Sequence, residues 1–269
     1  MSNRTLPRIL QTPAVILLLI WMLVPLSMTL YFSFIRYVLN SSIRPEWMSP
    51  SLSNWRGFGN YKYVLDAKDF WFAIQNSVFI VASILVLTVV LGLGIAVLIN
   101  KSFPGRGIVR VLLISPFFVM PAVNAVLWIN MILDPVLGLQ GIAVGSINDM
   151  IDGLRDFPVL GAFFNLWPTF EPISFRATQT SAYAVIMMVA WQWTPFAVLI
   201  FMTSLQSEDE SQKEAATLDG ASPWSQFINL TVPHLARPIA IVVMIQSIFH
   251  LSLYAEIEIV SRGSGNKNL

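Results

Sequence analysis

The chain alternates between long apolar runs and shorter polar stretches, and this pattern predicts its helices. The apolar runs lie at about 13–35, 75–99, 108–133, 181–205 and 239–255. An α-helix needs roughly 17–25 mostly apolar residues to cross a bilayer, so each run is long enough to form one span. The pattern predicts an all-α integral membrane protein, built as a bundle of about five transmembrane helices.

Prolines and glycines modify three of these runs. The first is too long for a signal-peptide core and has no small-residue cleavage site, so we interpret it as an uncleaved span that tolerates Pro25. Gly92 and Gly94 in the second run suit a close helix approach. Pro116 and Pro121 interrupt the third.

The polar segments divide the chain around these spans. Residues 1–12 form a short polar lead, and 13–269 form a single membrane domain. Residues 36–74 and 134–180 are mixed in composition, and we expect the second of them to be an irregular segment that forms a small exposed subdomain. The tail, 256–269, has glycines and no hydrophobic span.

The polar insert between the last two runs, residues 206–238, is called the handle below. It is far longer than a tight connection between neighbouring helices requires. Ser211 and Glu214 have the spacing of a capping box, and Gly220 can adopt the left-handed conformation that stops a helix. Ser222 with Pro223 fits the start of a second helix, which Pro233 is expected to end. The handle is therefore predicted to be two short helices joined at a glycine, a form suited to docking.

Composition agrees with a membrane protein and removes several function classes. Charged residues make up 12% of the chain and apolar residues 55%, whereas soluble domains carry about 25% charged residues. The net charge of +1 gives no reason to expect nucleic-acid binding. The chain has no cysteine, which excludes disulfides and thiolate chemistry.

No catalytic constellation is visible in the sequence. There is no phosphate-binding loop of the form G-x-x-x-x-G-K-[ST], so we do not expect the chain to hydrolyse ATP. The two histidines, His234 and His250, are sixteen residues apart on different elements, and no metal-binding pair or nucleophile elbow occurs. We predict no catalytic residue, no metal and no cofactor in this chain.

The interiors of the spans contain no Asp, Glu, Lys or Arg, which bears on both energy source and substrate. Ion-coupled carriers usually keep ionisable residues at membrane depth, so a neutral interior favours an external energy source and a neutral, hydroxylated substrate. Asn124 and Asn130 are six residues apart, which places them on different sides of an ideal helix. Such side chains also join membrane helices to one another, so each has packing as an alternative role. The candidates for a substrate path are Asn124, Trp128, Asn130, Trp191, Gln192, Thr194 and Gln246.

Four sequence motifs resemble one family of membrane proteins. Glu214-Ala215-Ala216, then Gly220, then Leu230-Thr231-Val232-Pro233 is similar to the EAA-x3-G-x9-I-x-L-P loop of permease subunits in binding-protein-dependent ABC importers. The segments 114–121, 190–196 and 254–257 resemble the sugar-permease branch, closest to its polyol (sorbitol or mannitol type) members. The resemblance extends from about Leu6 to the end of the chain. Such permeases usually have six spans, and this sequence ends at Leu269 after five.

This resemblance implies a function and a set of partners. It implies a multi-pass protein of the bacterial inner membrane that imports a neutral sugar or polyol, with a cytoplasmic ABC ATPase pair, a second homologous permease, an extracytoplasmic substrate-binding protein and membrane lipid as partners. ATP and Mg²⁺ would bind the ATPase, not this chain. The residues that the resemblance assigns to ATPase coupling are Glu214, Ala215, Ala216, Leu218, Gly220, Pro223 and Pro233.

Orientation and alternative functions complete the prediction. The basic residues in the tightest segments lean weakly toward an N-terminus inside the cell. Residues 36–74 and 134–180 would then be extracytoplasmic loops, and the handle would be a cytoplasmic coupling loop. The alternatives are a membrane scaffold or truncated, inactive permease that does not transport, and, less favoured by the uncharged spans, an ion-coupled carrier or a channel.

Overall fold

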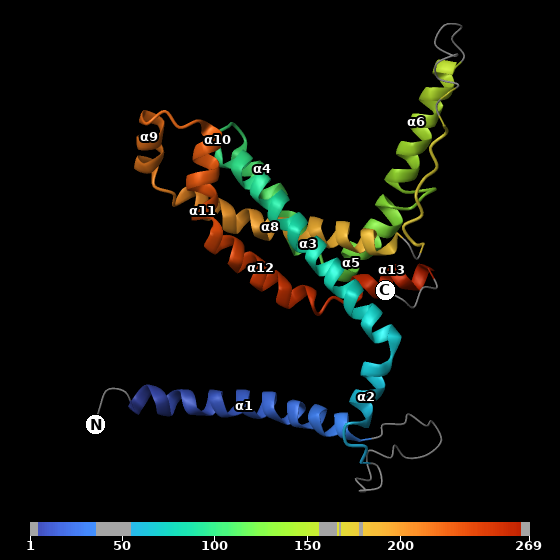
Figure 1. Cartoon of the computed structure of the whole chain (residues 1–269), viewed down its shortest axis with the longest axis vertical. Coiled ribbons are helices and arrows are strands. Elements are labelled where there is room, and N and C mark those ends of the chain that lie inside the picture. The colour runs from blue at the N-terminus through green and yellow to red at the C-terminus, as the bar shows by residue number, and fades with distance from the viewer. Residues whose placement is uncertain (1–4, 36–54, 156–165, 167, 178–179, 265–269) are drawn as a thin grey trace. The chain divides into compact units, whose positions relative to one another are not determined.

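The computed structural model describes residues 5–35, 55–155, 166, 168–177 and 180–264, and within these residues it is helical with one isolated β-bridge. It divides into two compact units, residues 1–72 and 73–269, which are described separately. Among the described residues, three helices are long and apolar enough to cross a membrane, and up to five spans result if each of two bent helix pairs counts as one. The predicted class, an all-α membrane protein with about five spans, is confirmed (Figure 1).

The first unit contains α1 (Thr5–Phe34) and α2 (Gly59–Asp66). From Leu10 onward, α1 exposes apolar side chains around its circumference, which suits a helix in contact with lipid or with other membrane helices. The amide Nδ2 of Asn60 donates to the carbonyl oxygens of Ser33 (2.9 Å) and Ile35 (2.8 Å), which fastens α2 to the end of α1. The segment expected as a loop over 36–74 therefore contains α2 and also the start of α3 (Lys68–Asn100).

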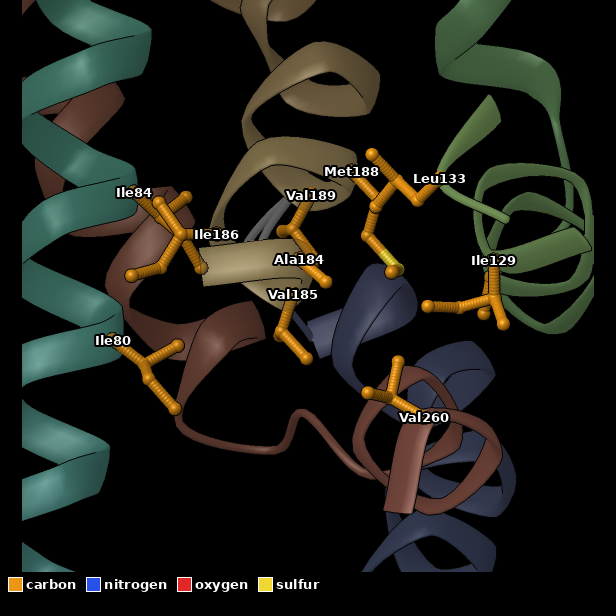
Figure 2. Close-up of a cluster of buried hydrophobic side chains, with 11 residues drawn as sticks. Ile80, Ile84, Ile129, Leu133, Ala184, Val185, Ile186, Met188, Val189 and Val260 are labelled. Atoms are coloured by element: carbon orange, nitrogen blue, oxygen red, sulfur yellow. The ribbon is translucent and has the colours of Figure 1, made fainter. Parts of the chain in front are cut away.

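The second unit is organised around α8 (Ser181–Gln206), the most buried of its candidate spans. Figure 2 shows one apolar cluster in which α8 meets α3 through Ile80 and Ile84, and α13 (Ala255–Ser264) through Val260. A second cluster joins the other half of α8 to α3 and to α12 (Ala236–His250). The predicted run, 181–205, ends one residue before α8 does, because polar residues bound this long apolar run.

The third predicted span is broken rather than merely interrupted. It consists of α4 (Arg106–Ile114) with the 3₁₀ turn η3 (Ser115–Phe118), and α5 (Pro121–Leu127) with the π-helical turn η4 (Trp128–Ile132). The two parts meet at a 102° bend. A residue before proline is driven out of the α region, and Met120 is extended at φ −61°, ψ 138°. A single span over 108–133 was therefore an incomplete prediction.

The segment predicted to be irregular contains a helix, and so does the tail, which was predicted to have no hydrophobic span. Residues 139–155 form α6 (Leu139–Arg155). Its Asn148 binds the backbone of Phe170: the side-chain oxygen accepts from the N–H (2.9 Å), and the side-chain nitrogen donates to the carbonyl (2.8 Å). At the turn before α6, backbone N–H groups of Leu137 and Val136 hold the pKa of Asp134 below its usual value. In the tail, α13 is short and amphipathic, so a search for long apolar runs missed it.

Candidate functional site: the handle and the polar side chains of the spans

The first arm of the handle is α9 (Glu210–Leu218). Its N-cap is Asp209, whose Oδ1 accepts from the backbone N–H (3.0 Å) and the hydroxyl (2.8 Å) of Ser211. The predicted capping box, with Ser211 as the cap, is therefore wrong by two residues. Asp and Ser are similarly good N-caps, so the sequence alone could not decide between them, and the helix begins after the first one, Asp209.

The joint between the arms is the left-handed glycine that the sequence predicts. Gly220 has φ +81°, the backbone N–H of Ala221 donates to Ala216 O (2.9 Å), and that of Gly220 donates to Thr217 O (3.0 Å). This pair of hydrogen bonds defines a Schellman motif, which satisfies carbonyl groups at the helix end. The joint therefore aims the second arm in a defined direction.

The second arm begins as predicted but ends later. Ser222 is its N-cap and accepts from the backbone N–H of Ser225 (3.2 Å), and Pro223 is the first residue of α10 (Pro223–Gln226). The helix then continues through the π-helical turn η5 (Phe227–Thr231) and α11 (Val232–His234), and bends by 54° before α12. Pro233 was expected to end this helix. The helix ends at His234, one residue after Pro233, because the π turn before the proline already accommodates its missing N–H.

The surface of the handle combines the motif residues with exposed apolar side chains. Glu214 and Ala215 are exposed, and Ala216 is half-buried. Leu218 at the end of the first arm is 89% exposed, and Trp224 in the second is 70% exposed. The amide of Gln226 donates to the hydroxyl of Thr217 (3.0 Å), which holds the arms together close to the joint. Large apolar side chains at the tip of a polar loop are typical of a surface that another protein covers.

Asn124 and Gln192 form a buried amide pair between α5 and α8. Asn124 Nδ2 donates to Gln192 Oε1 (3.0 Å) and to Met188 O (3.1 Å). Gln192 Nε2 donates to the carbonyl of Val119, inside the break of the third span. The carbonyl of Val119 is half-buried at a helix break and has lost its helical partner, and Gln192 supplies a donor to it. The pair thus fastens the break to the central helix.

The other candidates of the substrate path lie in different surroundings. Gln246 is fully buried and accepts from the hydroxyl of Thr88 (2.7 Å). Asn130 is exposed and accepts from the guanidinium of Arg176 (2.6 Å), so it does not share the surroundings of Asn124. Trp128, Trp191 and Thr194 all line one cavity of about 380 Å³, whose remaining wall is apolar.

An aromatic cluster that sequence reasoning missed surrounds Trp193. Its ring lies 5.4 Å from Phe117, 5.9 Å from Phe196, 5.1 Å from Phe249 and 5.0 Å from His250, between ring centroids. These residues come from η3, α8 and α12, so no local spacing in the sequence brings them together. The only sequence signal for this cluster was the number of aromatic residues in these apolar runs, and ordinary helix packing would explain that number equally well.

Three buried polar atoms near these candidates have no protein partner in the described part of the chain. They are Oδ1 of Asn124, Nε1 of Trp128 and Nε2 of His250. An unpaired buried polar atom costs roughly 1–3 kcal/mol. Each of these atoms therefore lacks the hydrogen bond that its burial calls for.

Comparison with known proteins agrees with this arrangement. The chain is 30% identical over 229 residues to a probable ABC transporter permease protein, y4oQ, of Sinorhizobium fredii, covering 85% of this chain and 65% of that protein. It is 29% identical over 190 residues to the trehalose/maltose transport system permease protein MalF of Thermococcus litoralis, covering 70% of this chain and 57% of that protein. The chain thus spans less than two thirds of the length of both relatives.

A solved structure shares the fold. A bacterial ABC transporter involved in the import of the acidic polysaccharide alginate contains a chain that is 18% identical, with a TM-score of 0.65, covering 97% of this chain and 82% of that one. Residues 6–269 match the family described as binding-protein-dependent transport system inner membrane component. This match extends over nearly the whole chain, and the chain therefore belongs to that family.

Proposed function

We propose that this chain is the membrane-spanning permease subunit of an ATP-driven importer for a neutral carbohydrate, a sugar or a polyol. The handle carries the proposal: two short helices fixed by a Schellman joint at Gly220 present the family's EAA residues beside the exposed Leu218 and Trp224. The handle would lie in the cytoplasm and bind a groove of an ABC ATPase subunit, with ATP and Mg²⁺ bound by that partner.

Closure of the ATPase pair would move the handle as a rigid element and reorient the spans. A second permease subunit would complete the path, and residues 36–74 and 134–180 would face an extracytoplasmic binding protein. The solved structures give this partner support, because one shows the alginate transporter in complex with a periplasmic protein that binds an alginate pentasaccharide.

A neutral substrate agrees with the chemistry of the spans. Aromatic faces around Trp193, and the unpaired polar atoms of Asn124, Trp128 and His250, suit an uncharged molecule with hydroxyl groups. No charged side chain lies between residues 182 and 206 or between 238 and 255 to bind a carboxylate or phosphate. Trehalose and maltose transport in the MalF relative is in line with this substrate class.

The proposal is tested by purifying the complex and measuring uptake. The chain is expressed together with its ATPase, second permease and binding protein, and the reconstituted complex is offered a panel of radiolabelled polyols and hexoses. We expect an ATPase pair to co-purify and one neutral compound to accumulate when ATP is supplied on the ATPase side. A stable complex without ATPase would instead favour a membrane scaffold.

Glu214→Lys is the matched variant for the docking role. It reverses one exposed charge on α9, so it should weaken attachment of the ATPase while the chain still inserts and folds. Co-purification of the ATPase at the wild-type ratio would count against docking through α9. Asp152→Lys, an exposed charge reversal on α6, serves as the control.

A further inference from the structure

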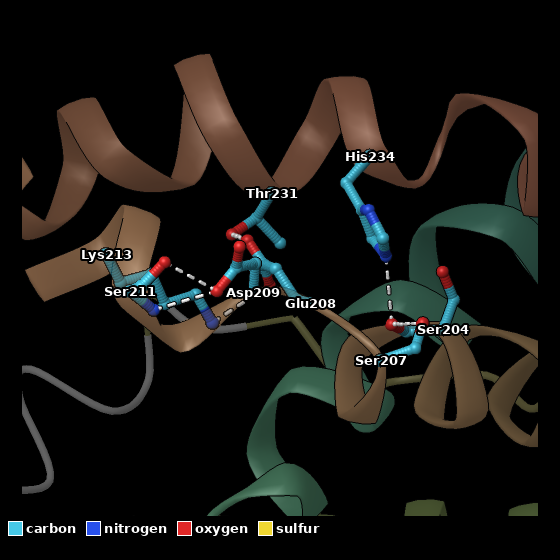
Figure 3. A network of polar contacts seen from close by, with 8 residues as sticks. All are labelled: Ser204, Ser207, Glu208, Asp209, Ser211, Lys213, Thr231 and His234. Atoms are coloured by element: carbon cyan, nitrogen blue, oxygen red, sulfur yellow. Dashed lines mark hydrogen bonds and ion pairs between the residues drawn. The ribbon is translucent and has the colours of Figure 1, made fainter.

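One carboxylate at the root of the handle contacts both of its arms. Glu208 lies between α8 and α9, and its Oε1 accepts a hydrogen bond from the hydroxyl of Thr231 (2.8 Å) in the second arm. Its Oε2 lies 2.9 Å from Nζ of Lys213 in the first arm. Figure 3 shows Thr231, Glu208 and Lys213 converging at this point. The two arms are therefore connected at their base as well as at the Gly220 joint.

The burial of this carboxylate makes its partners important. The side chain of Glu208 is only 6% exposed, although the handle around it is polar. Burying a carboxylate is unfavourable unless it is paired and hydrogen-bonded. Glu208 therefore favours the one arrangement of the arms in which Thr231 and Lys213 both reach it.

A second contact fastens the same arm to the central helix. Nε2 of His234 lies 3.0 Å from the carbonyl oxygen of Ser204 in the last turn of α8, so the histidine is the donor (Figure 3). The hydroxyl of Ser207 donates to the same oxygen (2.8 Å). Thr231 and His234 are three residues apart, about one helical turn, so they hold the second arm along one face.

We infer that Glu208 is a positioning residue that fixes the angle between the arms of the handle. The Schellman joint and the Gln226–Thr217 hydrogen bond hold the arms only near Gly220, so without a second connection the far end of α9 could still tilt when it is displaced. With Glu208 joining Lys213 to Thr231, a displacement of α9 is carried to α8 and α12. The part of this inference that concerns transmission of movement from the ATPase rests on the proposed function. The fixed angle between the arms does not depend on it.

The angle is measured on the full chain in lipid nanodiscs. The chain has no cysteine, so Gln212→Cys and Ile228→Cys place one spin label on each arm without background labelling. We expect a narrow distance distribution in the parent protein and a clearly broader one after Glu208→Ala. Glu210→Ala, which removes an exposed acid two residues away, is expected to leave the distribution narrow.

Thr231→Val is the second variant, because it removes one hydroxyl and keeps the shape of the side chain. It should broaden the distribution less than Glu208→Ala does. Equal, narrow distributions in the parent, Glu208→Ala and Thr231→Val proteins would overturn the inference, whether or not an ATPase binds the handle.

Coupling is measured separately in the assembled complex. For Glu208→Ala we expect the ATPase to co-purify normally and the substrate stimulation of ATP hydrolysis to fall by about fivefold or more, as for loss of a typical coupling free energy. A broader distribution with unchanged stimulation would refute the role in transmission and leave the importer proposal intact. Failure of even the parent complex to bind an ATPase would count against the proposed function, and the distance measurement would still decide the angle.

Discussion

At the scale of single residues, the amide pair of Asn124 and Gln192 shows how one side chain can serve two needs. Gln192 was chosen from the sequence because it is polar within an apolar run, and the structure places it as the donor to the carbonyl of Val119 at a helix break. Such a role depends on a contact between residues 73 positions apart. The sequence could therefore mark the residue as unusual but could not specify its partner.

Gln192→Leu should lower stability and change uptake together. The substitution leaves the Val119 carbonyl without its donor and removes the oxygen that accepts from Asn124, so we expect a loss of about 1–3 kcal/mol in unfolding free energy. We also expect altered substrate dependence of uptake while the complex still assembles. Thermal unfolding and uptake kinetics of the purified complex measure the two effects.

The double variant Asn124→Leu with Gln192→Leu is the control for this prediction. It removes both members of the pair, so its cost should be smaller than the sum of the two single variants. Unaltered uptake kinetics and thermal stability in Gln192→Leu would assign this residue to neither role.

Gly220→Val should uncouple transport from ATP hydrolysis. A Cβ at this glycine would have open space around it, so the penalty comes from φ +81° alone and amounts to about 1–2 kcal/mol or more for a β-branched residue. Gly220→Asn keeps the left-handed conformation accessible and should stay coupled. Substrate-stimulated ATPase activity distinguishes them, and wild-type stimulation in the valine variant would contradict the prediction.

At the scale of elements, the glycines of α3 show where pattern and structure agree. Both Gly92 and Gly94 were expected to allow close helix approach. A Cβ on Gly92 would lie 2.7 Å from Cβ of Ala197 on α8, whereas one on Gly94 would meet nothing within 4 Å in the described structure. Two residues apart on a helix, they face different directions, so the prediction is confirmed for Gly92 and wrong for Gly94 within this chain.

Gly92→Ala should therefore destabilise the contact between α3 and α8. Overpacking a tight contact costs about 1–3 kcal/mol, and Ala197 has no flexible end that could move aside. We expect a lower unfolding temperature for the purified full chain. Gly94→Ala makes the same substitution in the same helix without the clash, so it should leave the unfolding temperature unchanged or raise it slightly. Equal unfolding temperatures would exclude a close approach at Gly92.

The elements that the sequence predicted well are those with a single dominant signal. α8 and the Gly220 joint follow from a bounded apolar run and from a glycine after a short helix. α6 and α13 were missed because amphipathic helices have no long apolar run, and the break at Pro121 was underestimated because its angle depends on contacts with α8. The aromatic cluster of Trp193 was missed for the same reason, since three elements contribute to it.

At the scale of the whole molecule, the neutral interior of the spans predicts the energy source. Moving a proton or cation in step with substrate requires an ionisable group at membrane depth. Uptake into proteoliposomes that hold the complete complex should therefore require ATP on the ATPase side. It should persist when a protonophore or sodium ionophore collapses the ion gradients. Uptake that stops with the proton gradient while ATP remains would support an ion-coupled carrier instead.

The two apolar clusters give α8 an uneven mechanical character. One cluster holds its residues 184–189 and the other its residues 197–205, and between them lies Pro195, which lacks the N–H that would bond one turn back. The helix is thus packed tightly at both ends and has its weakest backbone hydrogen bonding near its middle. Gln192 and Thr194 lie beside this midpoint, where bending of the helix would reorient side chains with little displacement. A displacement transmitted from the handle would therefore bend α8 next to Gln192 and Thr194, between two packed segments.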